Sequence, residues 1–168
     1  MFTFEIFTVF FIGLIFGSFA NVCIARLPKD KTIIFGRSNC PKCSKKISWY
    51  DNIPLISFIL LGGKCRQCNK KISINYFFVE LITGIFFILI YLYTNSYFDF
   101  VLINLILILF LIIFFIDLKH FIIPDILNFS LIFLGLLKNF IPTKNLNFNY
   151  DIEQSIIGGV IGYLTIWI

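Results

Sequence analysis

Two C-x-x-C pairs give the first half of the chain a set of residues suited to metal chemistry. Residues 40–43 read C-P-K-C and residues 65–68 read C-R-Q-C, with 21 residues between the pairs. A C-x-x-C turn directs two thiolates toward one ion, and Zn²⁺ prefers four such ligands in a tetrahedron. This spacing predicts a structural Zn²⁺ site whose ligands are Cys40, Cys43, Cys65 and Cys68. A loop of this size cannot build its own core, so the metal would supply much of its folding energy.

The two pairs belong to an internal repeat. Residues 40–48 read C-P-K-C-S-K-K-I-S, and residues 65–73 read C-R-Q-C-N-K-K-I-S. The repeat predicts two similar knuckles that face each other across the metal. Thiol redox chemistry and cysteines without a present role are the alternatives. Cys23 lies apart from the pairs, and we interpret it as a small buried hydrophobic residue.

A second set of candidates consists of ionisable residues inside or beside long apolar segments. These are Glu80, Asp117, His120 and Asp125. An ionisable group at membrane depth is costly, which makes each a functional candidate. Asp117 is either a catalytic carboxylate or an interfacial charge paired with Lys119. His120 follows three residues later and could orient that carboxylate, although a histidine at the headgroup level is the alternative.

The segment after His120 predicts a break in the helix. Pro124 biases the preceding residue away from helical geometry. Asp125 then suits the N-cap of the next helix, and a direct chemical role is the second interpretation. Glu80 lies early in another apolar segment, where it could be a polar contact between helices or part of a substrate site.

The composition predicts that lipid surrounds most of the elements that carry these residues. Hydrophobic residues make up 59% of the chain and charged residues 14%, against roughly 45–50% and about 25% in soluble domains. We expect an all-α polytopic membrane protein with a small cytoplasmic zinc-binding loop. Its apolar segments predict about four complete transmembrane helices and a partial fifth, over residues 4–23, 76–93, 98–116, 126–140 and 156–168. The glycines of residues 158–162 predict close helix packing in the fifth.

The distribution of positive charge predicts the topology. Eleven of the 14 Lys and Arg residues lie between Arg26 and Lys71. Positive charge beside membrane spans marks the cytoplasmic side, so we expect a multi-pass inner-membrane protein with its N-terminus outside and residues 26–75 in the cytoplasm. The position of the cluster and the lack of a nucleic-acid motif argue against nucleic acid as a partner. A cleaved signal peptide is disfavoured because no Lys or Arg precedes the first apolar segment.

Five motifs, in order along the chain, resemble those of the bifunctional prepilin peptidases, the membrane aspartic peptidases that process type IV prepilins and type II secretion pseudopilins. Besides the paired C-x-x-C knuckles, these are G-S-F-A-N-V with R-L-P (residues 17–22 and 26–28), N-I-P-L-I-S (52–57), Y-F-F-V-E (76–80) and the I-D…I-P-D segment (116–125). The chain departs from the family pattern at Ala20, where Leu is usual, and at Phe77, where Pro is usual.

This resemblance implies a prepilin leader peptidase and N-methyltransferase. Such an enzyme cleaves the leader at the cytoplasmic membrane face and methylates the new N-terminal amine with S-adenosylmethionine. Prepilins and pseudopilins would be its partners, besides the lipid bilayer. Asp117 corresponds to the first catalytic aspartate, with His120 and Asp125 as candidate supporting groups, whereas the residues that bind S-adenosylmethionine are unknown. The implied parts are a first transmembrane helix (1–25), the zinc-binding module (26–75) and the aspartic peptidase region (76–168).

The second catalytic aspartate of the family lies in a G-x-G-D motif. The 168 residues contain no such motif. We therefore expect a peptidase region that is incomplete at its C-terminus and a chain that does not cleave by itself, unless Asp125 supplies the second carboxylate. The alternative function is an inactive membrane fragment, or a zinc-stabilised module that binds prepilins without cutting them.

Overall fold

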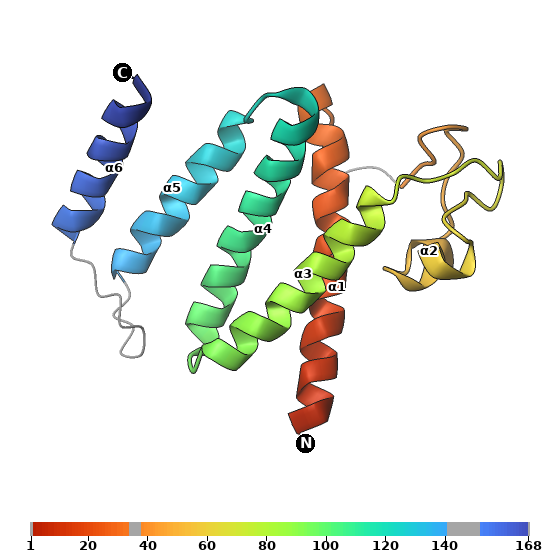
Figure 1. Ribbon diagram of the computed structural model, residues 1–168, viewed down its shortest axis with the longest axis horizontal. Helices are drawn as coiled ribbons and strands as arrows, with labels where there is room; N and C mark the ends of the chain where they lie inside the picture. The colour runs from red at the N-terminus through yellow and green to blue at the C-terminus, as the bar shows by residue number, and fades with distance from the viewer. Residues whose placement is uncertain (1, 34–37, 141–151, 168) are drawn as a thin grey trace.

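The chain forms a bundle of long helices with a small irregular module at one side (Figure 1). The computed structural model describes residues 2–33, 38–140 and 152–167. Its long helices are α1 (Phe2–Arg26), α3 (Asn75–Tyr93), α4 (Tyr97–His120), α5 (Asp125–Phe140) and α6 (Ile152–Trp167). Three short helices lie between α1 and α3 in the chain, namely η1 (Leu27–Lys29), η2 (Trp49–Asn52) and α2 (Ile56–Leu60).

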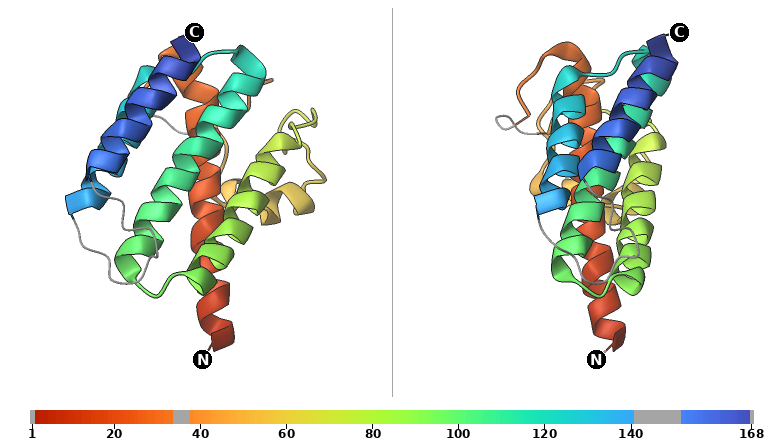
Figure 2. Two further views of the ribbon diagram at one scale, coloured as in Figure 1. Left: turned by 60° about the vertical axis from the view of Figure 1, so that its left-hand side comes forward. Right: turned by 90° about the vertical axis from the view of Figure 1, so that its left-hand side faces the viewer.

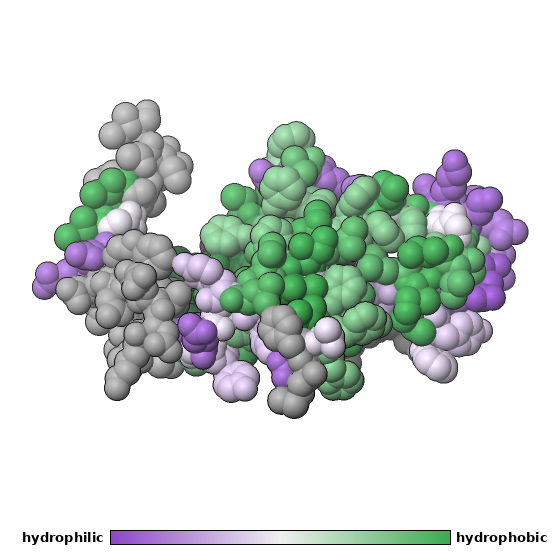
Figure 3. Space-filling model, turned by 60° about the horizontal axis from the view of Figure 1, so that its bottom comes forward, coloured by the Kyte–Doolittle hydropathy of each residue, from purple (hydrophilic) through white to green (hydrophobic). Residues whose placement is uncertain are grey.

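Three of the described helices are long and apolar enough to cross a membrane. They are α1 with its short extension (Thr3–Lys29), α3 and α4. The 16 residues of α5 span only about 24 Å at 1.5 Å per residue, less than the ~30 Å hydrocarbon core of a bilayer. The predicted helical membrane architecture is therefore confirmed, but the predicted count of four complete spans is not. Apolar residues cover the middle of the surface in Figure 3, and hydrophilic ones gather at the end formed by the module.

Glycines let α1 and α3 cross in close contact. A Cβ atom built on Gly13 would lie 2.8 Å from the Cα of Gly84, and one on Gly17 would lie 2.7 Å from the Cα of Glu80. Real Cβ atoms do not approach backbone this closely, so only glycine fits at these points. Gly13 and Gly17 form a G-x-x-x-G pattern, which is typical of tightly packed membrane helices. The crossing fixes the first half of α3, including Glu80, against α1.

Polar contacts bind α1 to α3 on both sides of this crossing. The side-chain amide of Asn21 donates to the carbonyl of Tyr76 at 3.0 Å. Toward the other end of the pair, the hydroxyl of Tyr91 donates to the carboxylate of Glu5 at 2.8 Å. Satisfied polar pairs of this kind are the ones a membrane interior tolerates, because lipid offers no other hydrogen-bonding partner.

A buried apolar core joins α1, α3, α4 and α5. Its members on α4 recur every four residues and all face the bundle, and Cys23 is 4% exposed, which agrees with our interpretation of this residue as a buried hydrophobic group. The core comprises Ala20, Cys23, Val79, Phe87, Ile108, Ile112, Ile116 and Leu127. Beyond the α3–α4 turn, α1 continues past the other helices (Figure 2).

One sequence prediction concerns the glycines of the C-terminal helix. Gly158 and Gly159 have no atom within 4 Å of the position of an added Cβ. Among the described residues these two glycines therefore make no close helix contact, and the predicted packing over residues 158–162 stays a prediction. The loop expected between α5 and α6 lies mainly outside the described residues.

Candidate functional site

The two C-x-x-C pairs fold into matching knuckles, as the repeat predicts. In the first, the N–H of Cys40 donates to the carbonyl of Lys45 at 3.0 Å, and in the second, the N–H of Cys65 donates to that of Lys70 at 3.0 Å. Each knuckle also turns through one residue in the left-handed region, Ser44 at φ 57° and Asn69 at φ 52°. The two similar sequences thus fold into matching turns, because hydrogen bonds between residues close in the chain set the geometry of each turn.

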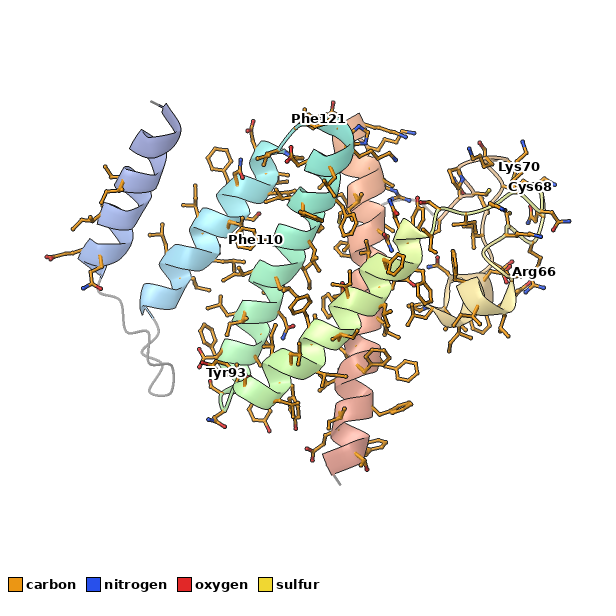
Figure 4. All side chains as sticks on the ribbon, viewed as in Figure 1. Arg66, Cys68, Lys70, Tyr93, Phe110 and Phe121 are labelled. Atoms are coloured by element: carbon orange, nitrogen blue, oxygen red, sulfur yellow. The ribbon has the colours of Figure 1, made fainter. Side chains whose placement is uncertain are left out.

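The two knuckles bring four sulfur atoms together. The Sγ atoms of the cysteines at 40, 43, 65 and 68 all lie within 4.8 Å of one another, and those of Cys40 and Cys68 are 3.9 Å apart. A Zn²⁺ ion with Zn–S bonds of about 2.3 Å would place tetrahedral sulfur atoms about 3.8 Å apart. Four soft ligands at this separation can hold one metal ion. Figure 4 shows Cys68 and Lys70 within this module, away from the helical bundle.

Proton sharing within the cluster favours a bound cation. Burial raises the pKa of the Cys40 thiol, but the N–H groups of Lys42 and Cys43 and the thiols of Cys43 and Cys65 outweigh it and lower that pKa to about 7. At Cys68 the N–H of Lys70 lowers the pKa, whereas burial and the other three thiols raise it to about 11. The Cys40 thiolate is stabilised by its neighbours and opposes the ionisation of Cys68, and a bound cation would relieve that opposition.

An ion pair braces the second knuckle against η2. The guanidinium of Arg66 donates to both carboxylate oxygens of Asp51 at 2.8–3.0 Å, and it lies 5.6 Å from the ring centre of Tyr50. The Arg66 side chain is 55% exposed, so we expect the pair to contribute no more than about 1 kcal/mol. It fixes orientation more than it adds stability.

Glu80 joins the module to the membrane helices. This residue of α3 is buried, and its Oε2 accepts a hydrogen bond from the backbone N–H of Leu55 at 2.9 Å. Leu55 has φ 56°, a left-handed conformation that costs a non-glycine residue about 1–3 kcal/mol. The contact gives a physical role to two motifs at once, since Leu55 belongs to N-I-P-L-I-S and Glu80 to Y-F-F-V-E.

A cavity of about 210 Å³ lies next to this joint, between α1, α3 and the cysteine module. Glu80, Ser18 and Asn21 contribute polar groups to its wall, while Phe58 and Phe77 contribute aromatic rings whose centroids are 5.5 Å apart. Sequence reasoning left Glu80 between a helix contact and a substrate site. In the structure its carboxyl group bonds to the backbone of the cysteine module at Leu55, and the residue lines the cavity.

The candidate carboxylates of the second set lie at the end of α4. Asp117 is exposed in the last turns of α4, and its backbone carbonyl accepts the N–H of Phe121 at 2.9 Å where the helix ends. The side chains of Asp117, His120 and Asp125 form no hydrogen bond or ion pair with one another among the described residues. Asp125 is the first residue of α5, across the break at Pro124. Figure 4 places Phe121 at the end of the bundle opposite Tyr93, beside the C-terminal end of α1.

Comparisons with known families divide the chain at the α3–α4 turn. The Bacterial Peptidase A24 N-terminal domain matches residues 11–94, and the Type IV leader peptidase family matches residues 103–168. A prepilin leader peptidase/N-methyltransferase of Klebsiella pneumoniae is 37% identical over 169 residues, which cover 95% of this chain and 70% of the relative. The chain belongs to the prepilin leader peptidase/N-methyltransferase family.

Other relatives of the same name show how much of a family member the chain represents. The protein of Vibrio cholerae serotype O1 is 44% identical over 162 residues, and the match covers 91% of this chain but 62% of that relative. That of Myxococcus xanthus is 49% identical over 79 residues, or 47% of this chain and 24% of the relative. The chain thus spans less than two thirds of the length of these two relatives. No solved structure is significantly similar to it.

Proposed function

We propose that the chain carries the methyl-transfer module and the first catalytic carboxylate of a prepilin leader peptidase/N-methyltransferase in the inner membrane. The observation that carries this proposal is the position of Asp117 within the segment that matches the Type IV leader peptidase family. The side chain is exposed at the end of a membrane helix, on the side of the bundle where α1 leads into the basic module. With residues 26–75 in the cytoplasm, that is the face at which leaders of prepilins and pseudopilins would be cut.

The chemistry requires a second carboxylate beside Asp117. In an aspartic peptidase one carboxylate activates water while the other, protonated, donates to the scissile carbonyl or leaving group. Two carboxylates a few ångströms apart cannot both ionise easily, and this raises the pKa of one of them. The family supplies the second from a G-x-G-D segment, and Asp125 is the candidate within the described residues. His120, half-buried one turn beyond Asp117, would act as a supporting group.

The four cysteines would hold Zn²⁺ in a structural role. All four coordination positions are filled by protein sulfur, and this leaves no open site for a reacting water. The surrounding lysines offset the negative charge of a four-thiolate centre. We expect the protein purified without chelator to contain about one zinc per chain, and Cys40→Ser to lose it together with the order of residues 38–73.

Methyl transfer would use S-adenosylmethionine. When bound, it would supply a methyl group from its sulfonium sulfur to the pilin amine nitrogen, which would lose a proton. The sulfonium needs a binding site that offers negative charge, and the acceptor needs access from the membrane, where the pilin helix lies. The end of α1 and α3 beside the cysteine module, with the buried carboxyl group of Glu80, supports a site there.

The test is the N-terminal mass of a prepilin incubated with membranes that contain the chain. One sample would contain the 168-residue chain, and the other a version extended by the downstream reading frame. We expect a cleaved and methylated N-terminus with the extended version. Prepilin that is captured but left uncut by both versions would contradict the peptidase proposal and favour a binding module.

A further inference from the structure

Glu80 presents a buried carboxyl group that pairs with no cation among the described residues. Its carboxylate is held by neutral donors, the N–H of Leu55 and the side chains of Ser18 and Asn21. It forms no ion pair with any described residue. Neutral donors of this kind orient the carboxyl group without supplying a counter-charge, so a cationic ligand beside it would form a charge-assisted pair.

The cavity beside Glu80 combines three kinds of surface. The carboxylate supplies a negative charge, and the half-buried rings of Phe58, Tyr76 and Phe77 supply flat apolar contact. Positive charge in the lining comes from Arg26, Lys45, Lys46, Lys64 and Arg66, of which Arg66 is paired with Asp51. Small-molecule sites commonly show this composition, in which apolar walls carry a few convergent polar groups.

One class of ligand matches these surfaces together. S-adenosylmethionine carries a sulfonium cation, an aromatic base and a carboxylate, which correspond to the acidic, aromatic and basic parts of the lining. A peptide with a free N-terminal amine offers the cation, and its first side chain could meet the rings, but it brings no carboxylate to the lysines.

We propose that the cavity between α1, α3 and the cysteine module is the site for the sulfonium methyl donor, with Glu80 as the residue that binds its cation. The inference rests on the proposed methyltransferase function and deepens it, since it names the carboxylate and the walls of the site. It also gives the zinc module a role, because the knuckles form one side of the cavity. The strained turn at Leu55 holds Glu80 from that side through its N–H.

The test compares two probes that differ in one charge. S-adenosylmethionine has the sulfonium, whereas S-adenosylhomocysteine has a neutral thioether in its place; both keep the α-ammonium group. Equilibrium dialysis of the full chain in lipid nanodiscs would measure both dissociation constants. Because Glu80→Gln removes a hydrogen bond to a charged group, we expect it to raise the dissociation constant of S-adenosylmethionine roughly 10- to 150-fold. We expect the dissociation constant of S-adenosylhomocysteine to rise by less than about 3-fold.

Two further variants separate binding from folding. Asp99→Asn removes another buried carboxylate, near the start of α4 and outside the cavity lining, and we expect both constants to stay unchanged. Ala25→Trp places a large ring at an exposed position that lines the cavity, and we expect both probes to bind at least about 10-fold more weakly. The zinc content of each variant reports whether the module is still folded.

The outcomes distinguish this inference from the proposed function. Wild-type binding of S-adenosylmethionine that neither Glu80→Gln nor Ala25→Trp weakens would overturn the site and leave methyl transfer standing. No binding by the wild-type chain would overturn both. If Glu80→Gln instead weakens only a peptide with an N-terminal phenylalanine amine, the cavity holds the acceptor and the proposal for the donor is wrong.

Discussion

The contact between Gly17 and Glu80 makes a quantitative prediction about the bundle. In Gly17→Ala the new methyl group would lie 2.7 Å from the Cα of Glu80 and 3.1 Å from the Cβ of Thr83. The nearest atom is backbone, so α1 and α3 must separate. Overpacking of this kind costs about 1–3 kcal/mol. Gly158→Ala is the matched control, because no atom lies within 4 Å of its added methyl group.

Native-state labelling of Cys23 measures this free energy. The thiol is 4% exposed and packs in the core of the bundle, so a thiol reagent reaches it only when the helices open. A loss of 1–3 kcal/mol corresponds to labelling about 5- to 160-fold faster, read for this cysteine by peptide mass spectrometry. We expect Gly158→Ala to change the rate by less than about 2-fold. Equal labelling rates in the two variants would refute the close crossing of α1 and α3.

Three further predictions concern the module and the far end of the bundle. Removal of the metal by a chelator should open residues 38–73 to proteases while α1, α3 and α4 stay helical by circular dichroism, since the knuckles have no core of their own. Arg66→Ala should leave the urea midpoint of metal release close to that of the unsubstituted chain, because the pair with Asp51 is largely exposed; a clearly lower midpoint would contradict this reasoning. Tyr91→Phe should destabilise the bundle by about 0.5–1.5 kcal/mol through the lost bond to Glu5, measured by the same Cys23 labelling, and no change would show that the bond is not formed in lipid.

Local patterns made the cysteine module predictable. The repeat at 40–48 and 65–73 sets hydrogen bonds that span only a few residues, such as Cys40 to Lys45. A sequence that repeats therefore folds twice into the same turn, and the spacing between the pairs brings the sulfur atoms together. The helix break before Asp125 was predictable for the same reason, because the restriction imposed by Pro124 is local.

Contacts between distant segments could not be read from the sequence. The hydrogen bond from Leu55 to Glu80 joins residues 25 positions apart. Neither of the two motifs that contain these residues indicates that they would meet. The crossing of α1 and α3 did leave a signal, the G-x-x-x-G pattern of Gly13 and Gly17, which our sequence analysis did not use. The predicted count of four complete spans is not confirmed, because the described part of α5 is apolar but shorter than a full crossing.

The most direct test of the central claim is the effect of Asp117→Asn on leader cleavage. The substitution keeps the size of an exposed side chain that makes no hydrogen bond or ion pair with described residues, so the fold should survive. In membranes that contain the version extended through a G-x-G-D segment, we predict that cleavage of a prepilin falls at least about 100-fold. Cleavage by Asp117→Asn at the unsubstituted rate would contradict the assignment of Asp117 as a catalytic carboxylate.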